Sequence, residues 1–330
     1  MSNSIIKKIW PHLLVVVVFI AVISFFFFPH WQGKVMIQGD VSSWEGSAKE
    51  ILDYNKTHPN DPALWTGTMF SGMPSYQIST PTHYNFLNYV QRALALFFLS
   101  GPIATFFYCA LSFYVLYLVL GLSLPFAAVG GLATTLVTGN FIVWEAGHLP
   151  KLIVLAMTGF IIAGLILSYR GKWLLGAAIF GLGIGINVLN NHVQMSYYTM
   201  ILLLPLIVSY AVSAIKEKKI NSFVIPSAIL AGVTALALLA SSSSILPTYE
   251  YAKETMRGGH ILKNKAGSTE GDVNQGGLQW DYAMNWSNGS TDVLSCLIPG
   301  LAGGGSSEPV DASSATVKEI RKKGYQPPKR

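Results

Sequence analysis

The residues that could do chemistry in this chain gather in three short polar segments, which separate long apolar runs. The first segment holds Asp40, the second holds Glu145, His148 and Lys151, and the third holds His192, Gln194 and Tyr198. A carboxylate held near lipid headgroups can deprotonate an incoming hydroxyl or bind a divalent cation such as Mg²⁺ or Mn²⁺. Imidazole, ammonium and amide groups can stabilise charge that develops on a phosphate leaving group. Together, these side-chain types are suited to binding an anionic lipid headgroup.

Each segment also has a simpler interpretation. Asp40 could be a turn or helix-capping acid, and the other two segments could be solvated loops between helices. The spacing of His148 with Lys151 and of His192 with Gln194 is not that of metal ligands on a helix, which argues against zinc.

The composition indicates the kind of protein that must position these groups. Of the 330 residues, 51% are apolar and only 12% are charged, and the mean hydropathy is +0.44. An ordinary soluble enzyme and a disordered chain are both excluded by this balance. The net charge is +6, but the basic residues are scattered over loop ends, so no nucleic-acid partner is expected.

Apolar windows long enough to cross a bilayer recur along the chain, and we expect about seven transmembrane helices. Their approximate bounds are Pro11 to Phe28, Pro102 to Leu120, Pro125 to Trp144, Leu152 to Tyr169, Trp173 to Leu189, Tyr197 to Ala214 and Phe223 to Leu246. The first window ends without a small-residue cleavage site, so it is expected to stay as an anchor.

The basic residues predict the orientation of these crossings. If Lys7 and Lys8 lie in the cytoplasm, seven crossings place the short loops with Arg170/Lys172 and Lys216/Lys218/Lys219 on that same side. The three polar segments then share the other face. We therefore expect an all-α polytopic protein of a cytoplasmic membrane, with a cytoplasmic N-terminus and a long first extracytoplasmic loop.

Four regions follow from this topology: 1–29 with the first crossing, 30–93 as the first outer loop, 94–246 with six further crossings, and 247–330 as an outer tail. Ser42 to Glu45 fits a capping box, so Asp40 should stand just before an amphipathic helix with Trp44 in the headgroup belt. In the fifth window, Ala177, Gly181 and Gly185 should allow close helix packing. In the tail, aromatics beside amides between Leu278 and Ser287 suit either sugar stacking or docking of the tail.

Taken jointly, several motifs carry a resemblance to a known family. They are Gly39-Asp40, Phe70-Ser71-Gly72-Met73-Pro74, Glu145-Ala146-Gly147-His148 with Lys151, Asn191-His192-Val193-Gln194 with Tyr197-Tyr198, and Tyr282 to Trp286 before Leu297-Ile298-Pro299-Gly300. Their order, from about Trp10 to Gly305, resembles the YfhO family of bacterial membrane proteins.

This resemblance implies a GT-C-type glycosyltransferase of the bacterial inner membrane, with a seven-helix module. Such an enzyme takes a sugar from a polyprenyl-phosphate carrier in the membrane lipid and passes it to an envelope glycan acceptor. By position, Asp40 would be the catalytic or metal-binding acid. Family members usually continue with further spans, so this chain is expected to be a fragment or to have an altered end.

Two other functions remain open from the sequence. A transporter or flippase for a lipid-linked or small polar solute would also have several spans and a polar outer mouth. However, no Asp, Glu, Lys or Arg lies near mid-membrane in the predicted spans, and coupled transporters usually need such groups. A scaffold without catalytic activity, binding through its outer loops, is the third.

Overall fold

The fold is that of a computed structural model, which describes residues 2–79, 85–255, 280, 284–285, 287, 289–294, 298, 301, 311 and 313–324. Two units make up the chain, Met1–Tyr251 and Ala252–Arg330. Within its described residues, the second unit holds η2 (Ala252–Glu254), α15 (Ser290–Leu294) and α16 (Ala315–Lys322). Of the tail residues singled out from the sequence, Leu278, Gln279, Asp281–Ala283, Trp286, Leu297, Pro299 and Gly300 lie outside the described residues.

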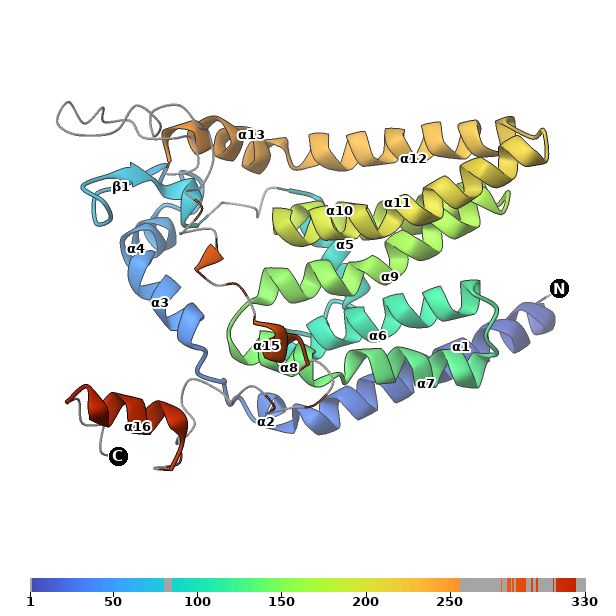
Figure 1. Cartoon of the computed structure of the whole chain (residues 1–330). Helices are drawn as coiled ribbons and strands as arrows, with labels where there is room; N and C mark the ends of the chain where they lie inside the picture. Colours follow the sequence, from blue (N-terminus) through green and yellow to red (C-terminus); the bar gives the residue numbers. More distant parts are fainter. Residues whose placement is uncertain are drawn as a thin grey trace. The chain divides into compact units, whose positions relative to one another are not determined.

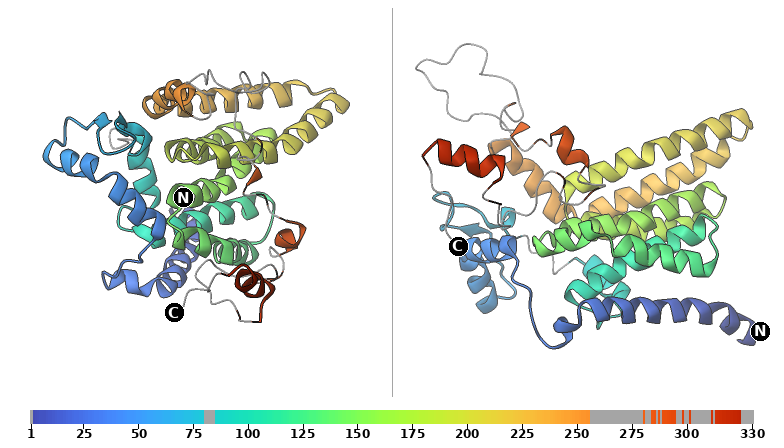
Figure 2. Two further views of the ribbon diagram at one scale, coloured as in Figure 1. Left: turned by 60° about the vertical axis from the view of Figure 1, so that its left-hand side comes forward. Right: turned by 60° about the horizontal axis from the view of Figure 1, so that its bottom comes forward.

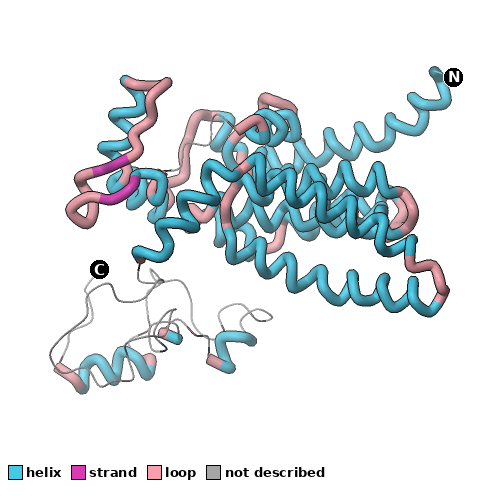
Figure 3. The backbone as a smooth tube through the Cα atoms, turned by 90° about the horizontal axis from the view of Figure 1, so that it is seen from above, coloured by secondary structure: helices cyan, strands magenta, loops and turns pink. Residues whose placement is uncertain are grey.

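The first unit is built almost wholly of helices. They are α1 (Ser2–Phe26), α2 (Phe28–Trp31), α3 (Gly39–Ser47), α4 (Lys49–Thr57), η1 (Ser75–Gln77), α5 (Leu87–Leu94), α6 (Gly101–Val119), α7 (Leu124–Thr135), α8 (Thr138–Glu145), α9 (Leu149–Tyr169), α10 (Trp173–Leu189), α11 (Val193–Lys216), α12 (Asn221–Ala240) and α13 (Ser242–Tyr251). Strands β1 (Trp65–Thr66) and β2 (Met73–Pro74) form one antiparallel hairpin, with Trp65 opposite Pro74 (Figure 3).

The expectation of an all-α polytopic protein is confirmed. Among the described residues, α1, α6, α9, α11 and α12 are long and apolar enough to cross a membrane. The pair α7 and α8 adds a sixth crossing if it counts as one span, and α10 is a shorter apolar helix.

The helices of the first unit run back and forth between two ends (Figure 1, and the right-hand view of Figure 2). One end, here called the basic end, holds the start of α1 and the turns α6–α7, α9–α10 and α11–α12, and so carries Lys7, Lys8, Arg170, Lys172, Lys216, Lys218 and Lys219. The opposite end, here called the polar end, holds α3, α4, the hairpin, the α8–α9 turn and α13.

Helix α9 is the centre of the bundle and packs against both α6 and α10. Small residues allow the two approaches. A Cβ on Gly159 would lie 2.8 Å from the Ser112 carbonyl oxygen of α6, and one on Gly164 would lie 2.6 Å from the Gly176 carbonyl oxygen of α10. Because lipid gives helices no hydrophobic reason to associate, such close backbone contact is a main source of their attraction.

The small residues expected to pack in α10 contact other partners. A Cβ on Gly181 would meet the Val233 side chain of α12 at 3.1 Å, and one on Gly185 would meet Leu87 of α5 at 3.3 Å. The tightest contact of α10 instead uses Gly176, one residue before the predicted Ala177. Helix α10 has neighbours on several sides, so the single row of small residues could not show which neighbour packs closest.

The expected third crossing, Pro125 to Trp144, is not one straight helix. It breaks between α7 and α8, which are bent by 41°. The Asn140 side-chain amide donates to the carbonyl oxygens of Thr134 and Thr135, each at 3.0 Å. These carbonyls have lost helical partners at the break, and an unpaired carbonyl in lipid is costly.

The expected last crossing, Phe223 to Leu246, also ends early. Helix α12 stops at Ala240, and α13 begins at Ser242. The Asn85 amide, distant in sequence, donates to the Ala240 carbonyl at 3.0 Å and to the Ser241 hydroxyl at 3.2 Å. An asparagine therefore supports each of the two breaks.

The segment after α2 departs from the predicted capping box. Helix α3 begins at Gly39, so Asp40 lies in its first turn and Ser42 lies inside the helix, without a side-chain cap at Gln38. The chain then turns at the buried Ala48 into α4. The Trp44 indole N–H donates to the Ile78 carbonyl oxygen at 2.8 Å.

Replacing Gly164 with alanine should destabilise the bundle, because the new methyl group would meet the backbone of α10, which cannot move aside as a side chain can. Overpacking of this kind costs about 1–3 kcal/mol. Thermal unfolding of the detergent-solubilised protein measures the loss. The control is Gly232→Ala in α12, where no heavy atom lies within 4 Å. It should raise the melting temperature slightly, since alanine favours a helix by about 0.5–1 kcal/mol. Equal shifts would contradict the packing described.

Candidate functional site

Asp40 and His148 form the contact around which the candidate site is built. The Asp40 Oδ2 atom lies 2.5 Å from the His148 Nε2 atom, across 108 residues of sequence. Both side chains stay open to solvent, at 64% for Asp40 and 44% for His148. A carboxylate fixed by an imidazole and still reachable from outside is an arrangement that can exchange protons with a bound molecule.

Glycine at position 147 permits this contact. Gly147 has a φ of +91°, and a Cβ there would lie 3.0 Å from the Val41 Cγ2 atom and 3.2 Å from the Val41 backbone nitrogen. The start of α3 therefore sits directly against the α8–α9 turn. Gln38 secures the same approach, because its side-chain amide donates to the Trp144 carbonyl oxygen.

The α8–α9 turn holds His148 just before the first turn of α9. The His148 backbone N–H donates to the Val143 carbonyl at 3.1 Å, and its carbonyl accepts from Leu152 at 3.1 Å. Lys151 follows in the first turn of α9. Among the described residues, its ammonium group makes no hydrogen bond or ion pair, so it remains able to bind an anion.

His192 interacts electrostatically with Lys151 and His148. It caps α11, and its Nδ1 atom accepts a hydrogen bond from the Met195 N–H at 3.4 Å. Burial lowers the pKa of His192 below its ordinary value, and the positive charges of Lys151 and His148 lower it further. The shift favours the neutral form of His192, and the turns that carry His148 and His192 lie at the same end of the bundle.

The remaining predicted residues lie nearby in sequence but outside this set of contacts. Gln194 donates to the Tyr198 hydroxyl at 2.8 Å, and both side chains are exposed at the start of α11. Glu145 is exposed at the end of α8. Within the described part of the chain, none of the three makes a hydrogen bond or ion pair with Asp40, His148 or His192.

Two residues that support the site were not predicted from the sequence. The buried Asn187 accepts a hydrogen bond from the Ser196 hydroxyl at 2.7 Å and donates to the Val154 carbonyl at 3.5 Å, so it ties α10 to α11 and α9 beneath His192. Gln38 is the second. The signal for Asn187 was an amide in an apolar span, whereas the role of Gln38 depends on a tertiary contact that no local pattern encodes.

The residues also bear on the expected divalent cation. Over the described residues, no group of three or more His, Cys, Asp or Glu side chains is arranged to hold a metal ion. Asp40 and His148 offer two ligands. Mg²⁺ commonly takes one or two carboxylates and completes its shell with water and substrate phosphate, so Asp40 fits the protein part of such a site.

Gly147→Val should separate Asp40 from His148, because the new side chain would collide with Val41 and would be strained at this φ. Cross-linking of Asp40→Cys to His148→Cys by a short bis-maleimide reports the separation, and its yield should fall several-fold in the Gly147→Val background. Gly33→Val is the matched control, since Gly33 also has a positive φ, +74°, but nothing within 4 Å. Unchanged cross-linking with Gly147→Val would refute this account.

His192 should make the protein less stable in mild acid. Its pKa is lowered in the folded state, so the unfolded state binds more protons as pH falls through the ordinary value of 6.5 and below. Melting temperatures between about pH 7.5 and pH 5.5 measure this loss. His192→Asn keeps a residue that caps helices and should flatten the slope. Lys151→Met, which removes a positive charge, should flatten it partly. A slope unchanged by His192→Asn would assign the acid sensitivity elsewhere.

Comparison with protein-family models, with curated proteins and with solved structures finds no match to this chain.

Proposed function

We propose that this chain is a membrane glycosyltransferase, as its resemblance to the YfhO family implies. The enzyme would transfer a sugar from a polyprenyl-phosphate carrier to an extracytoplasmic acceptor of the cell envelope. The observation that carries the proposal is the pairing of Asp40 with His148 at 2.5 Å, with Lys151 in the first turn of α9 and His192 at the start of α11. An acid, a free cation and a neutral imidazole at one membrane face are the groups that such a transfer needs.

The proposed orientation places the basic end in the cytoplasm of a bacterium and the polar end outside its inner membrane. Lys and Arg concentrate in short cytoplasmic loops of membrane proteins, and the short turns at the basic end carry Arg170, Lys172, Lys216, Lys218 and Lys219, whereas those at the polar end carry Lys151. Counting α7 with α8 as one crossing, and α10 as another, gives the seven crossings of the GT-C-like fold. The polyprenyl chain would then lie in the outer leaflet, with its phosphate at the level of the α8–α9 turn.

In the proposed reaction, Asp40 is the general base. His148 donates its Nε2–H to the carboxylate and so fixes its direction. The acceptor hydroxyl oxygen forms a bond to the anomeric carbon of the sugar, and its proton passes to Asp40. The bond between that carbon and the phosphate oxygen breaks, and its electron pair leaves with the polyprenyl phosphate.

Lys151 and His192 would act on the leaving phosphate. The Lys151 ammonium provides a positive charge, and His192, kept neutral by burial, can donate one N–H without adding to the repulsion around Lys151. Glu145, Gln194 and Tyr198 would contact hydroxyl groups of the donor or acceptor. In the alternative role, Asp40 would hold a divalent cation that neutralises the phosphate, in place of acting as the base.

Asp40→Asn should abolish sugar transfer while leaving membrane insertion intact, because an amide cannot accept the proton. Loss of a general base lowers the rate by about 10²- to 10⁴-fold. Mass spectrometry of envelope glycans, in cells lacking the gene and complemented with each variant, measures the product.

The control is Asp53→Asn. Asp53 is an acid of α4 that pairs with Lys49 and Lys56 on the surface. This variant should restore the glycan fully, at membrane levels equal to those of Asp40→Asn. Near-normal product with Asp40→Asn would remove Asp40 from the mechanism.

One observation favours the second candidate, a transporter or flippase. The α7–α8 span is broken, and discontinuous helices often form substrate sites in transporters. Proteoliposomes containing the purified chain and a fluorescent polyprenyl-phosphate sugar would distinguish the two. Movement of the lipid between leaflets without formation of a transfer product would reverse the ranking.

A further inference from the structure

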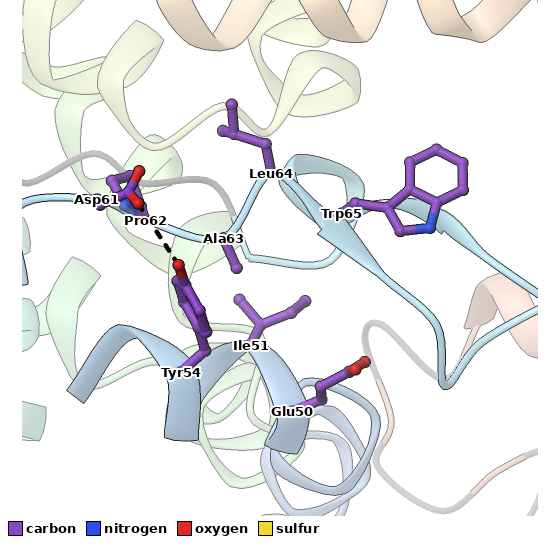
Figure 4. A pocket seen from close by; sticks show the side chains of 8 residues that line it. All are labelled: Glu50, Ile51, Tyr54, Asp61, Pro62, Ala63, Leu64 and Trp65. Atoms are coloured by element: carbon purple, nitrogen blue, oxygen red, sulfur yellow. Dashed lines mark hydrogen bonds between the residues drawn. The ribbon is translucent and has the colours of Figure 1, made fainter. Parts of the chain in front are cut away.

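A trough on the outer loop, separate from Asp40, has the features of a ligand site. It lies between α4 and the strand β1 and has a volume of about 380 Å³, which is within the range of small-molecule sites. Its lining is Glu50, Ile51, Tyr54, Asp61, Pro62, Ala63, Leu64 and Trp65. Figure 4 shows an apolar centre of Ile51 and Ala63, with Asp61 and Tyr54 on one side and Glu50 and Trp65 on the other.

Trp65 presents an exposed aromatic ring that is held in place by the backbone at Gly72. Its indole is 62% exposed, yet it lies against Gly72 so closely that a Cβ there would be 2.9 Å from the ring atom Cζ2. Gly72 has a φ of +119°, which a larger residue would adopt only under strain. Figure 4 shows the indole turned away from Ile51 and Ala63, so it lies at the edge of the trough, where its open side is suited to stacking against the C–H face of a sugar ring.

The polar groups at the two sides of the trough are also held in place. The Tyr54 ring stacks on His58 with centroids 4.2 Å apart, and its hydroxyl donates to the Asp61 Oδ2 atom at 3.4 Å. Opposite, the Glu50 Oε2 atom accepts from the Thr66 hydroxyl and from the Gly67 N–H at 3.0 Å. These bonds, the Thr66 hydroxyl first, lower the pKa of Glu50, so an ionised acceptor persists at neutral pH.

The trough is also connected to the catalytic candidate. Helix α3, which carries Asp40, precedes α4 in the chain, and the Trp44 indole fastens α3 to Ile78, just after the hairpin. A molecule lying in the trough would therefore be bound to the same small assembly of helices and hairpin that positions Asp40.

From these contacts we propose that the trough between α4 and β1 binds a neutral oligosaccharide, with Asp61 and Glu50 accepting hydroxyl hydrogen bonds and Trp65 stacking on a sugar ring that extends over the edge of the trough. Its role as the acceptor subsite rests on the proposed glycosyltransferase function, whereas saccharide binding itself does not. The acceptor class is then a glycan rather than a protein side chain.

The test uses the full chain in detergent and the trisaccharides maltotriose, cellotriose and chitotriose as probes. Saturation-transfer NMR should detect binding of at least one of them. Trp65→Ala should weaken that binding about tenfold, and Asp61→Asn, which leaves the apolar centre and the aromatic surface intact, should weaken it several-fold. The matched control is Phe70→Ala, since Phe70 is an exposed aromatic of the same hairpin that does not line the trough.

The outcomes separate this inference from the proposed function. Asp40→Asn should bind the trisaccharide like the unmodified chain even though transfer is lost. Absence of binding for all three probes, or equal binding by Trp65→Ala and Phe70→Ala, would overturn the saccharide site whatever the transfer assay shows. Binding only of a lysine-rich peptide, through the two acids, would overturn it as well.

Discussion

Every backbone group that this protein places in lipid must find its partner inside the protein, and the rest of the structure depends on this constraint. It explains why apolar residues form helices almost throughout, and why the helix breaks occur where they do. At the α7–α8 break, the Asn140 amide donates to the two carbonyls that lack helical partners. At the end of α12, the Asn85 amide donates to the Ala240 carbonyl in the same way. A break in a transmembrane helix is therefore tolerated only where a side chain can replace the missing helical hydrogen bonds.

The same bundle determines what meets at the polar end. Because α9 packs closely on α6 and α10, the turns before and after these helices have little freedom to drift. The α8–α9 turn then presents His148 to α3, and Gly147 allows the backbones to approach. His192 arrives from the next turn at the same end, where Asn187 and Ser196 support it. The chemistry proposed for the site thus depends on contacts made well below it.

Much of the architecture was predictable because the sequence patterns that encode it extend over many residues. Runs of apolar residues and the clustering of lysines at alternate turns predicted the crossings and placed Asp40, His148 and His192 on one face. Short-range features were not predictable to the same degree. Ser42 and Glu45 matched a capping box, yet the helix begins at Gly39, next to the contact of Gln38 with Trp144. The breaks and the Trp65 trough depend on partners distant in sequence or on the φ of one glycine, which hydropathy does not encode.

The distance along the chain between Asp40 and His148 has a consequence for biogenesis. In the proposed orientation the acid would reach the outer side of the membrane early in synthesis, together with the first anchor, while its imidazole partner is still 108 residues away in the growing polypeptide. The pair forms only after α6, α7 and α8 have left the translocon and α9 has begun to insert. Until then Asp40 is a solitary surface carboxylate, so a chain stalled on the ribosome at any earlier point carries the acid without the group that orients it.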